Sequence, residues 1–218
     1  MNMQGMMQGA IFDMDGTLLD SMPVWDTLSE AYLLGKDIRP PVDLYEIIRP
    51  LSVTKTAEYF RAQLGLTLST EEIVGEINGS IADKYIHEVL LKPYVREYLQ
   101  QLKEAGVRMC VATATAKPLA VAALTRTGIL PYFDFVLTCP EAGLHKDTPA
   151  FFQQALVRLQ TPREETVVFE DALYAMRSAK AAGLYVVGVS DPSASVLEKE
   201  IRRTADQYIQ GFEELIGV

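Results

Sequence analysis

The fold of this chain is constrained most by an alternation of short apolar runs with longer helical stretches, which begins after Pro93 and continues to the C-terminus. Runs of strand character lie at residues 107–112, 135–138, 166–169 and 185–189, with a weaker run at 207–209. Helices are expected at residues 95–105, 118–127, 149–159 and 173–182, and a last one at the C-terminus. Because strands that alternate with helices form parallel sheets covered on both faces, the sequence predicts an α/β fold with a doubly wound parallel sheet.

One further apolar run, at residues 10–12, stands apart from this alternation, because a long segment of helical pattern follows it. Helices are expected there at residues 23–34, around residues 44–48, at 52–64 and from about 70 to 91. Ser69 and Glu72 have the spacing of a capping box at the start of the last of these helices. We therefore expect two domains, a core of residues 1–17 and 92–218 and an α-helical cap of residues 18–91.

Length, charge and cysteine content argue against several classes of protein. At 218 residues the chain can form one α/β domain with a smaller insertion. Its net charge of −9 disfavours a surface for nucleic acid or anionic membranes, and no apolar run is long enough to span a bilayer. Cys110 and Cys139 lie in or beside apolar segments and are expected to be buried thiols of a reducing compartment. With no signal-peptide pattern at the start of the sequence, we expect a cytoplasmic location.

Two carboxylates, Asp13 and Asp15, directly follow the first apolar run. Side chains two residues apart on an extended chain point the same way, so both acids can face one small volume beyond the strand. Two close anions persist there only if a cation binds between them or one carboxylate keeps its proton. An acidic turn without chemistry is the alternative for this pair taken alone.

Polar side chains also follow the later strands, at the edge of the sheet where parallel strands end. These residues are Thr113, Lys146, Glu170 and Asp171. Singly, each has an ordinary structural explanation: a strand-end hydroxyl, a solvated loop lysine, and two acids that cap the next helix. Together with the two aspartates after the first strand, they predict an acidic metal-binding pocket with one lysine and one hydroxyl.

In this order and setting, the residues resemble the motifs of the haloacid dehalogenase-like hydrolase superfamily. The first motif is residues 13–17 (Asp-Met-Asp-Gly-Thr), the second Thr113, the third Lys146, and the fourth residues 168–171 (Val-Phe-Glu-Asp). The resemblance covers nearly the whole chain and implies a Rossmann-like core with an inserted all-helical cap, as in the branch of β-phosphoglucomutases and sugar-phosphate phosphatases. The chain departs from the family at residues 147–150 (Asp-Thr-Pro-Ala), where relatives have Pro-x-Pro-Asp.

The resemblance implies phosphoryl transfer to a carboxylate. Asp13 would be the nucleophile, since an ionised carboxylate can attack phosphorus once the phosphoryl charge is neutralised. Asp15 would protonate the leaving oxygen and then act as base for the attacking water, which requires a closed and dry cleft.

The same resemblance implies Mg²⁺ as the cofactor, because that ion prefers hard oxygen ligands. Its expected ligands are the carboxylate of Asp13, the backbone carbonyl of Asp15 and the carboxylate of Asp171, with Glu170 as an inner or outer ligand.

Substrate binding would fall to residues of the second and third motifs. The Thr113 hydroxyl and the backbone N–H of Ala114 would hold phosphate oxygens, and Lys146 would screen the charge between the nucleophile and the phosphate. Gly16 would leave room for the backbone to approach the phosphate.

The predicted function is hydrolysis of a small phosphomonoester, with sugar phosphates as the expected class, through an aspartyl-phosphate. A phosphosugar mutase of the β-phosphoglucomutase type is the first alternative, although such mutases carry a histidine in the first cap helix where this chain has Trp25. A non-catalytic regulatory binding protein is the second. The expected partner is a small phosphorylated metabolite, and candidates for selecting it are Trp25, Arg49, Lys55 and Asp20.

Overall fold

The computed structural model describes residues 7–48 and 51–217, and its core is a six-stranded parallel sheet. The strands are β1 (Gly9–Phe12), β4 (Arg108–Thr113), β5 (Phe135–Thr138), β6 (Thr166–Glu170), β7 (Tyr185–Val189) and β8 (Gln207–Ile209). Their order is β5-β4-β1-β6-β7-β8, so β1 lies in the interior of the sheet between β4 and β6. After β1, the chain forms β4 and β5 on one side of β1 and then crosses to the other side, where it forms β6, β7 and β8.

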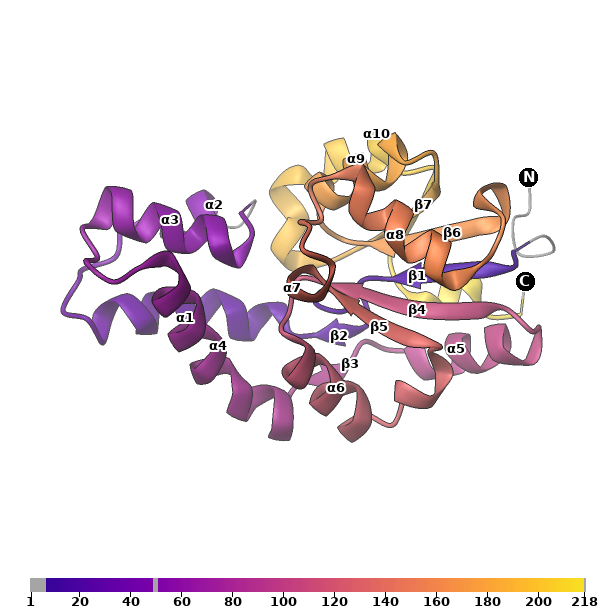
Figure 1. Ribbon diagram of the computed structural model, residues 1–218, viewed down its shortest axis with the longest axis horizontal. Helices are drawn as coiled ribbons and strands as arrows, with labels where there is room; N and C mark the ends of the chain where they lie inside the picture. Colours follow the sequence, from indigo (N-terminus) through magenta and orange to yellow (C-terminus); the bar gives the residue numbers. More distant parts are fainter. Residues whose placement is uncertain (1–6, 49–50, 218) are drawn as a thin grey trace.

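Helices cover both faces of this sheet (Figure 1). They are α5 (Val95–Glu104), α6 (Lys117–Arg126), α7 (Cys139–Ala142), α8 (Pro149–Leu159), α9 (Leu173–Ala181) and α10 (Glu198–Thr204). Because side chains alternate along a strand, Phe12 packs with residues of α5 and α6, whereas Ile11 packs with residues of α8 and α9. Both side chains are fully buried, which confirms the predicted doubly wound sheet.

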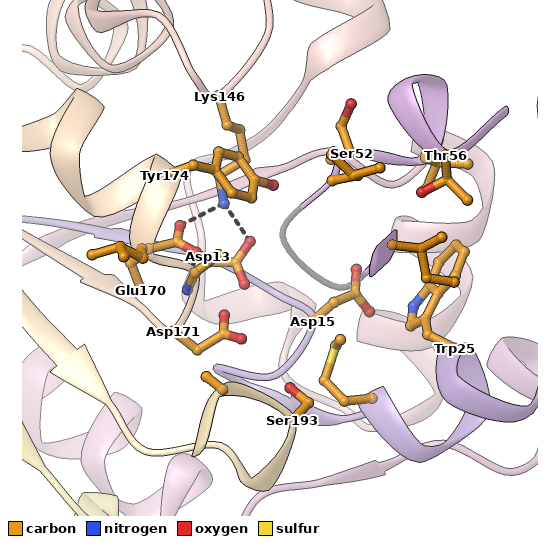
Figure 2. Close-up of a pocket in the computed structure, with 18 of the residues that line it drawn as sticks. Asp13, Asp15, Trp25, Ser52, Thr56, Lys146, Glu170, Asp171, Tyr174 and Ser193 are labelled. Atoms are coloured by element: carbon orange, nitrogen blue, oxygen red, sulfur yellow. Dashed lines mark hydrogen bonds and ion pairs between the residues drawn. The ribbon is translucent and has the colours of Figure 1, made fainter. Parts of the chain in front are cut away.

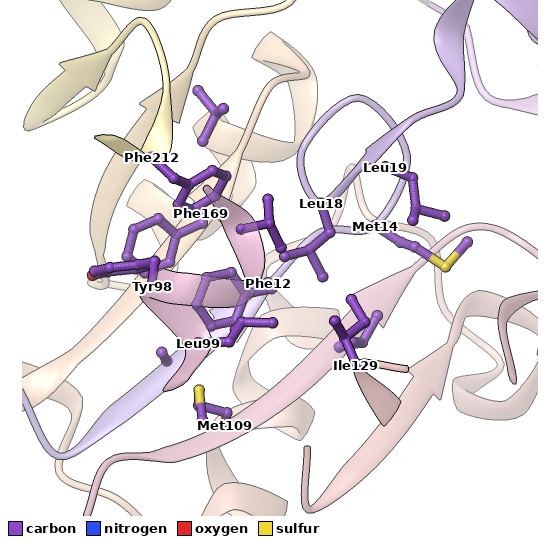
Figure 3. Packing of buried hydrophobic residues seen from close by; sticks show 14 of the residues in the cluster. Phe12, Met14, Leu18, Leu19, Tyr98, Leu99, Met109, Ile129, Phe169 and Phe212 are labelled. Atoms are coloured by element: carbon purple, nitrogen blue, oxygen red, sulfur yellow. The ribbon is translucent and has the colours of Figure 1, made fainter. Parts of the chain in front are cut away.

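Aromatic packing holds the ends of β1 and β6 together (Figure 3). Phe12 pairs in register with Phe169, and their rings stack with centroids 4.5 Å apart and planes inclined by 10°. The ring of Tyr98 packs edge-on against Phe169, with centroids 5.6 Å apart. Such pairs contribute about 0.5–1.5 kcal/mol beyond their buried area. Since Asp13 and Glu170 directly follow these two phenylalanines, the packing fixes the relative position of both acids.

A helical segment with its own apolar cluster lies between β1 and β4 along the chain. Its helices are α1 (Met22–Leu34), α2 (Leu44–Ile48), α3 (Val53–Leu64) and α4 (Thr70–His87). Leu33, Phe60 and Ile73 are fully buried in the cluster that these helices share. Two short antiparallel strands, β2 (Leu19–Asp20) and β3 (Leu90–Leu91), pair where the segment leaves and rejoins the core. Figure 1 shows α1–α4 standing beside the sheet, at the left of the molecule.

The predicted elements agree with the structure to within one residue at most boundaries, and the exceptions have local causes. The helix expected to reach residue 91 ends at His87, because Leu90 and Leu91 pair with β2 instead. The expected C-terminal α-helix is wrong: Phe212–Leu215 form a 3₁₀ turn. Phe212 and Leu215 are both buried, and a spacing of three residues, one turn of a 3₁₀ helix, places them on the same face of this short segment.

Among the described residues, three further 3₁₀ segments lie at Leu130–Tyr132, Arg163–Glu165 and Pro192–Leu197, and the short helices α7 and α10 lie between the predicted elements. Cys110 and Cys139 are free and buried, as expected. Within the described residues, the helices are all too short or too polar to cross a membrane. The division into core and cap at residues 17/18 and 91/92 stays a prediction.

Candidate active site

The predicted site residues meet at the carboxyl-terminal edge of the sheet, beside its interior strand. Asp13 follows β1, Thr113 ends β4, Glu170 ends β6, and Lys146 lies in the loop between α7 and α8. Here the winding of the sheet reverses, and open α/β sheets bind ligands at such a point. One cavity of about 360 Å³ is lined by every residue predicted for the site, namely Asp13, Asp15, Thr113, Ala114, Lys146, Glu170 and Asp171.

A tight turn after Asp13 brings the first motif against the fourth. The N–H of Gly16 donates to the carbonyl of Leu19 at 3.0 Å, which closes the turn. Gly16 has a φ of +82°, and a Cβ at this position would lie 2.5 Å from Oδ2 of Asp171, so only glycine fits. The Thr17 hydroxyl donates to Oδ1 of Asp171 at 3.2 Å. The turn therefore orients Asp171 as well as the two aspartates that it contains.

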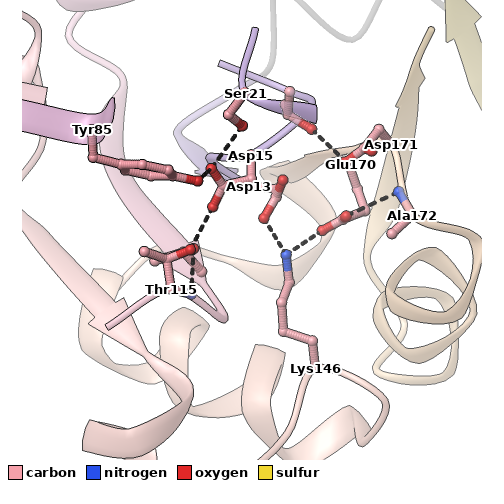
Figure 4. Close-up of polar contacts among 11 residues, drawn as sticks. Asp13, Asp15, Ser21, Tyr85, Thr115, Lys146, Glu170, Asp171 and Ala172 are labelled. Atoms are coloured by element: carbon pink, nitrogen blue, oxygen red, sulfur yellow. Dashed lines mark hydrogen bonds and ion pairs between the residues drawn. The ribbon is translucent and has the colours of Figure 1, made fainter. Parts of the chain in front are cut away.

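Lys146 links the nucleophile candidate to the fourth motif (Figure 4). Its Nζ lies 2.5 Å from Oδ1 of Asp13 and 2.6 Å from Oε2 of Glu170, and the residue is only 4% exposed. Burial alone would lower the pKa of the ammonium, but Asp13 and Glu170 outweigh burial and hold that pKa well above its ordinary value. Lys146 is therefore a fixed positive charge beside Asp13.

Asp13, Glu170 and Asp171 form a buried acidic cluster, with one oxygen of each within 4.8 Å of the others. Burial and the neighbouring Asp13 charge raise the pKa of Glu170 to about 7. Burial, Asp13 and Glu170 likewise hold the pKa of Asp171 well above its usual range. One lysine does not balance three carboxylates, and an all-oxygen donor set suits a hard divalent cation. The chemistry of this cluster thus fits Mg²⁺.

Asp15 lies in different surroundings, among hydroxyl groups (Figure 4). Ser21 donates to its Oδ1 at 2.8 Å, Tyr85 donates to the same oxygen, and Thr115 donates to Oδ2 at 2.6 Å. Burial and the nearby Asp13 raise the pKa of the Asp15 carboxyl, against the effect of these hydrogen bonds. A raised pKa favours a carboxyl group that keeps a proton available, which is what a general acid needs.

The helical segment forms the opposite wall of the cavity (Figure 2). Most of its lining side chains are apolar: Met22, Trp25, Ile48, Leu51, Val53 and Ile77. Ser52 and Thr56 add hydroxyls to this wall, and Ser52 also caps α3 by accepting from the N–H of Lys55. The cavity therefore has a charged side on the core and a mainly apolar side on α1–α4.

The four specificity candidates lie in different places. Trp25 lines the cavity, whereas Asp20 is exposed in β2. Lys55 lines an adjoining cavity and pairs with Asp147 at 2.9 Å, so it connects α3 to the loop that departs from the family pattern. Arg49 lies outside the described residues.

Sequence reasoning missed the residues that hold Asp15. Thr115 follows Thr113 at the two-residue spacing of the strand and could have been found by that signal. Ser21 sits at the start of α1, where a serine is expected as a helix cap. Tyr85 lies 70 positions from Asp15 in a helix with an apolar face, and no sequence pattern marks its hydroxyl.

Comparisons with known proteins agree with this geometry. The family model for haloacid dehalogenase-like hydrolases matches residues 7–183. The phosphorylated carbohydrates phosphatase of Thermotoga maritima is 29% identical over 184 residues, which cover 82% of this chain and 82% of that protein. The fructose-1-phosphate phosphatase YqaB of Escherichia coli is 29% identical over 186 residues, 83% of this chain and 95% of that protein. The crystal structure of CbbY from Rhodobacter sphaeroides in complex with phosphate superposes with a TM-score of 0.85, at 24% identity and 98% coverage of both chains, and so has the same fold.

Proposed function

Since this chain belongs to the haloacid dehalogenase-like hydrolase family and is a hydrolase of phosphoric monoesters, we propose that it hydrolyses a small sugar phosphate through an aspartyl-phosphate on Asp13. The observation that carries this proposal is the contrast between the two aspartates. Asp13 is paired with the Lys146 ammonium, whereas Asp15 is surrounded by hydroxyls and has a raised pKa. Two carboxyl groups in such different surroundings can act as nucleophile and as acid.

In the first step, an oxygen of Asp13 attacks phosphorus and the bond from phosphorus to the leaving oxygen breaks. Asp15 gives its proton to that oxygen, and the sugar leaves as an alcohol. Lys146 offsets the repulsion between Asp13 and the phosphate. The Thr113 hydroxyl already accepts from the Thr115 N–H at 3.0 Å, so its own hydrogen is free to donate to a phosphate oxygen.

In the second step, Asp15 takes a proton from water as the water oxygen attacks phosphorus. The bond between phosphorus and Asp13 breaks, and inorganic phosphate and the original carboxylate result. Asp15 thereby regains the proton that it gave up, so the cycle closes without another acid or base.

The acidic cluster would hold Mg²⁺ through Asp13, Glu170 and Asp171, together with the backbone carbonyl of Asp15. When bound, this ion would neutralise phosphoryl charge during transfer.

Residues 18–91 would act as a cap that opens to admit substrate and closes to exclude water. Its two connections to the core lie next to each other, because β2 and β3 pair with each other there. Rotation about these connections would leave the sheet undisturbed. A cavity of about 360 Å³ under such a cap suits a compact metabolite better than a phosphorylated polypeptide.

The test is to supply Mg²⁺ with hexose 1- and 6-phosphates, other sugar phosphates and small phosphoesters, and to measure phosphate release and isomer formation separately. We expect inorganic phosphate from at least one sugar phosphate, and no isomer. If the product is an isomerised sugar phosphate with negligible free phosphate, the protein is a mutase and the proposed hydrolase activity is wrong.

A further inference from the structure

Asp15 receives one of its hydrogen bonds from a residue far away in sequence, at the end of α4. Tyr85 lies in the last turn of that helix, is fully buried, and donates its hydroxyl hydrogen to Oδ1 of Asp15. Figure 4 shows its ring reaching Asp15 beside Ser21 and on the other side from Thr115. Thr115 lines the main cavity, whereas Tyr85 does not, so Tyr85 acts behind Asp15 rather than on the substrate.

The direction of this hydrogen bond is set by Trp25. The indole N–H of Trp25 donates to the Tyr85 oxygen at 2.8 Å, and the two rings pack edge-on with centroids 6.4 Å apart. A phenol carries a single hydrogen, and an oxygen that already accepts from an indole directs that hydrogen to its other neighbour. Ser21 also lies beside the phenol, but its own hydroxyl donates to Asp15, so the acceptor left for the phenol hydrogen is Asp15. The indole therefore donates to the phenol, and the phenol donates to the carboxyl group.

The backbone at Tyr85 is attached to the core. Arg126, in the last turn of α6, donates to the carbonyl of Tyr85 at 3.2 Å and also to the carbonyl of Val89. These contacts place the phenol between the two parts of the molecule, with α1 supplying Trp25 on one side and the core supplying Asp15 on the other.

We propose that Tyr85 is a positioning residue for Asp15 and that Trp25 orients its hydroxyl for this task. The proposal rests on the function proposed above, in which Asp15 is the acid and base. A carboxyl group has free rotation about its last bond unless both oxygens are held, and here Ser21 and Tyr85 hold one oxygen while Thr115 holds the other. Without Tyr85, Ser21 alone holds Oδ1 by a single hydrogen bond, so Asp15 stays in place but samples a wider range of orientations, some of which do not reach the leaving oxygen.

This role predicts which substrates depend on Tyr85. The leaving group of an alkyl phosphate is a strongly basic alkoxide unless it receives a proton, so hydrolysis of this ester needs a correctly oriented Asp15. The leaving group of p-nitrophenyl phosphate is p-nitrophenolate, which is stable as an anion, so hydrolysis of this ester needs little proton transfer. The ratio of kcat/KM for the two esters therefore reports on the orientation of the acid, and general loss of structure would lower both values together.

The experiment compares Tyr85→Phe with the wild-type enzyme on p-nitrophenyl phosphate and on the alkyl phosphates of the sugar series. We expect kcat/KM for the alkyl esters to fall by about 10- to 100-fold, and that for p-nitrophenyl phosphate to change by less than about threefold. Trp25→Phe should give the same pattern with a smaller loss. Tyr32→Phe is the matched control, because Tyr32 of α1 also donates to a carboxylate, that of Glu76 in α4 at 2.7 Å, and neither residue lines the cavity. It should leave both values unchanged.

Asp15→Asn separates failure of this inference from failure of the proposed function. Suppose that Asp15→Asn lowers kcat/KM much more for the alkyl ester than for p-nitrophenyl phosphate, but that Tyr85→Phe lowers kcat/KM for both esters equally or for neither. The positioning role of Tyr85 is then wrong, and the role of Asp15 as the acid is retained. If Asp15→Asn itself shows no preference for the activated ester, or the wild-type enzyme hydrolyses no alkyl phosphate, the proposed function fails and the positioning role fails with it.

Discussion

The two walls of the cavity differ in composition and in how they are held. On the core wall, acids that follow strand ends pair with a lysine from the α7–α8 loop, as Asp13 and Glu170 do with Lys146 at distances of 2.5 and 2.6 Å. On the opposite wall, helices α1–α4 present mainly apolar side chains such as Val53 and Ile77. The core wall holds charged groups in fixed positions, whereas the wall formed by α1–α4, here called the cap wall, gives the cavity its shape.

This difference indicates that the two walls contact different parts of the substrate. Charges buried beside one another are tolerated because they are paired, and a phosphoryl group needs them in fixed positions. An apolar wall contributes contact with whatever part of the substrate is not phosphate. We therefore expect substitutions on the core wall to lower kcat and substitutions on the cap wall to change KM and substrate preference.

The largest effect should come from Asp13→Asn. The amide oxygen can still accept from Lys146, so the local structure should survive, but the side chain can no longer attack phosphorus. We expect kcat to fall by at least about 10³-fold. The thermal unfolding midpoint serves as the control for folding. Hydrolysis near the wild-type rate would rule out Asp13 as nucleophile.

Removal of the metal should have the next largest effect. Activity should disappear with a chelator and return with Mg²⁺ or Mn²⁺, and Asp171→Ala should raise the Mg²⁺ concentration for half-maximal activity at least about tenfold. Asp134→Ala is a suitable control, because that acid pairs with Arg108 on the surface. Full activity after exhaustive chelation would contradict the metal assignment.

The acidic cluster should also make the stability of the metal-free protein depend on pH. The pKa of Glu170 is 4.5 in the unfolded chain and about 7 in the folded protein. At a pH between these two values, the folded protein therefore holds a proton on Glu170 that the unfolded chain has lost. Stability from this group is greatest at low pH and declines as the pH rises through about 7.

Between about pH 5 and pH 8, the free energy of unfolding of the wild-type protein should therefore drop by on the order of 2 kcal/mol more than that of Glu170→Gln. Denaturant titrations of both metal-free proteins at each pH measure this difference, and saturating Mg²⁺ should reduce it. Parallel pH profiles for the two proteins would show that Glu170 does not change its protonation on folding.

The smallest effect should come from the cap wall. Thr56→Val removes a buried hydroxyl while keeping the shape of the side chain. If that hydroxyl contacts the sugar, KM for the preferred sugar phosphate should rise about 2- to 10-fold with little change in kcat. Methyl phosphate, which has no sugar part, is the control substrate. A fall in kcat without a change in KM would remove the distinction between the two walls.

The core wall could be predicted from the sequence because parallel strands end at one edge, so Asp13, Thr113 and Glu170 could be assigned to a common place from their positions at strand ends. The strands themselves are continuous apolar runs, which buried parallel strands require. The cap wall could not be predicted in the same way. Which side chains of α1–α4 face the cavity depends on how those helices pack, and the apolar Leu90 and Leu91 even extended the predicted α4 into β3.

Formation of the covalent intermediate is the most direct test of the account. Enzyme with Mg²⁺ is mixed with a hydrolysed sugar phosphate, quenched in acid during turnover, and digested for mass spectrometry of its peptides. The account predicts the added mass of one phosphoryl group on the peptide that contains Asp13, at the Asp13 side chain, and none in Asp13→Asn. Turnover without any phosphorylated peptide, or with phosphate on another residue, would contradict it.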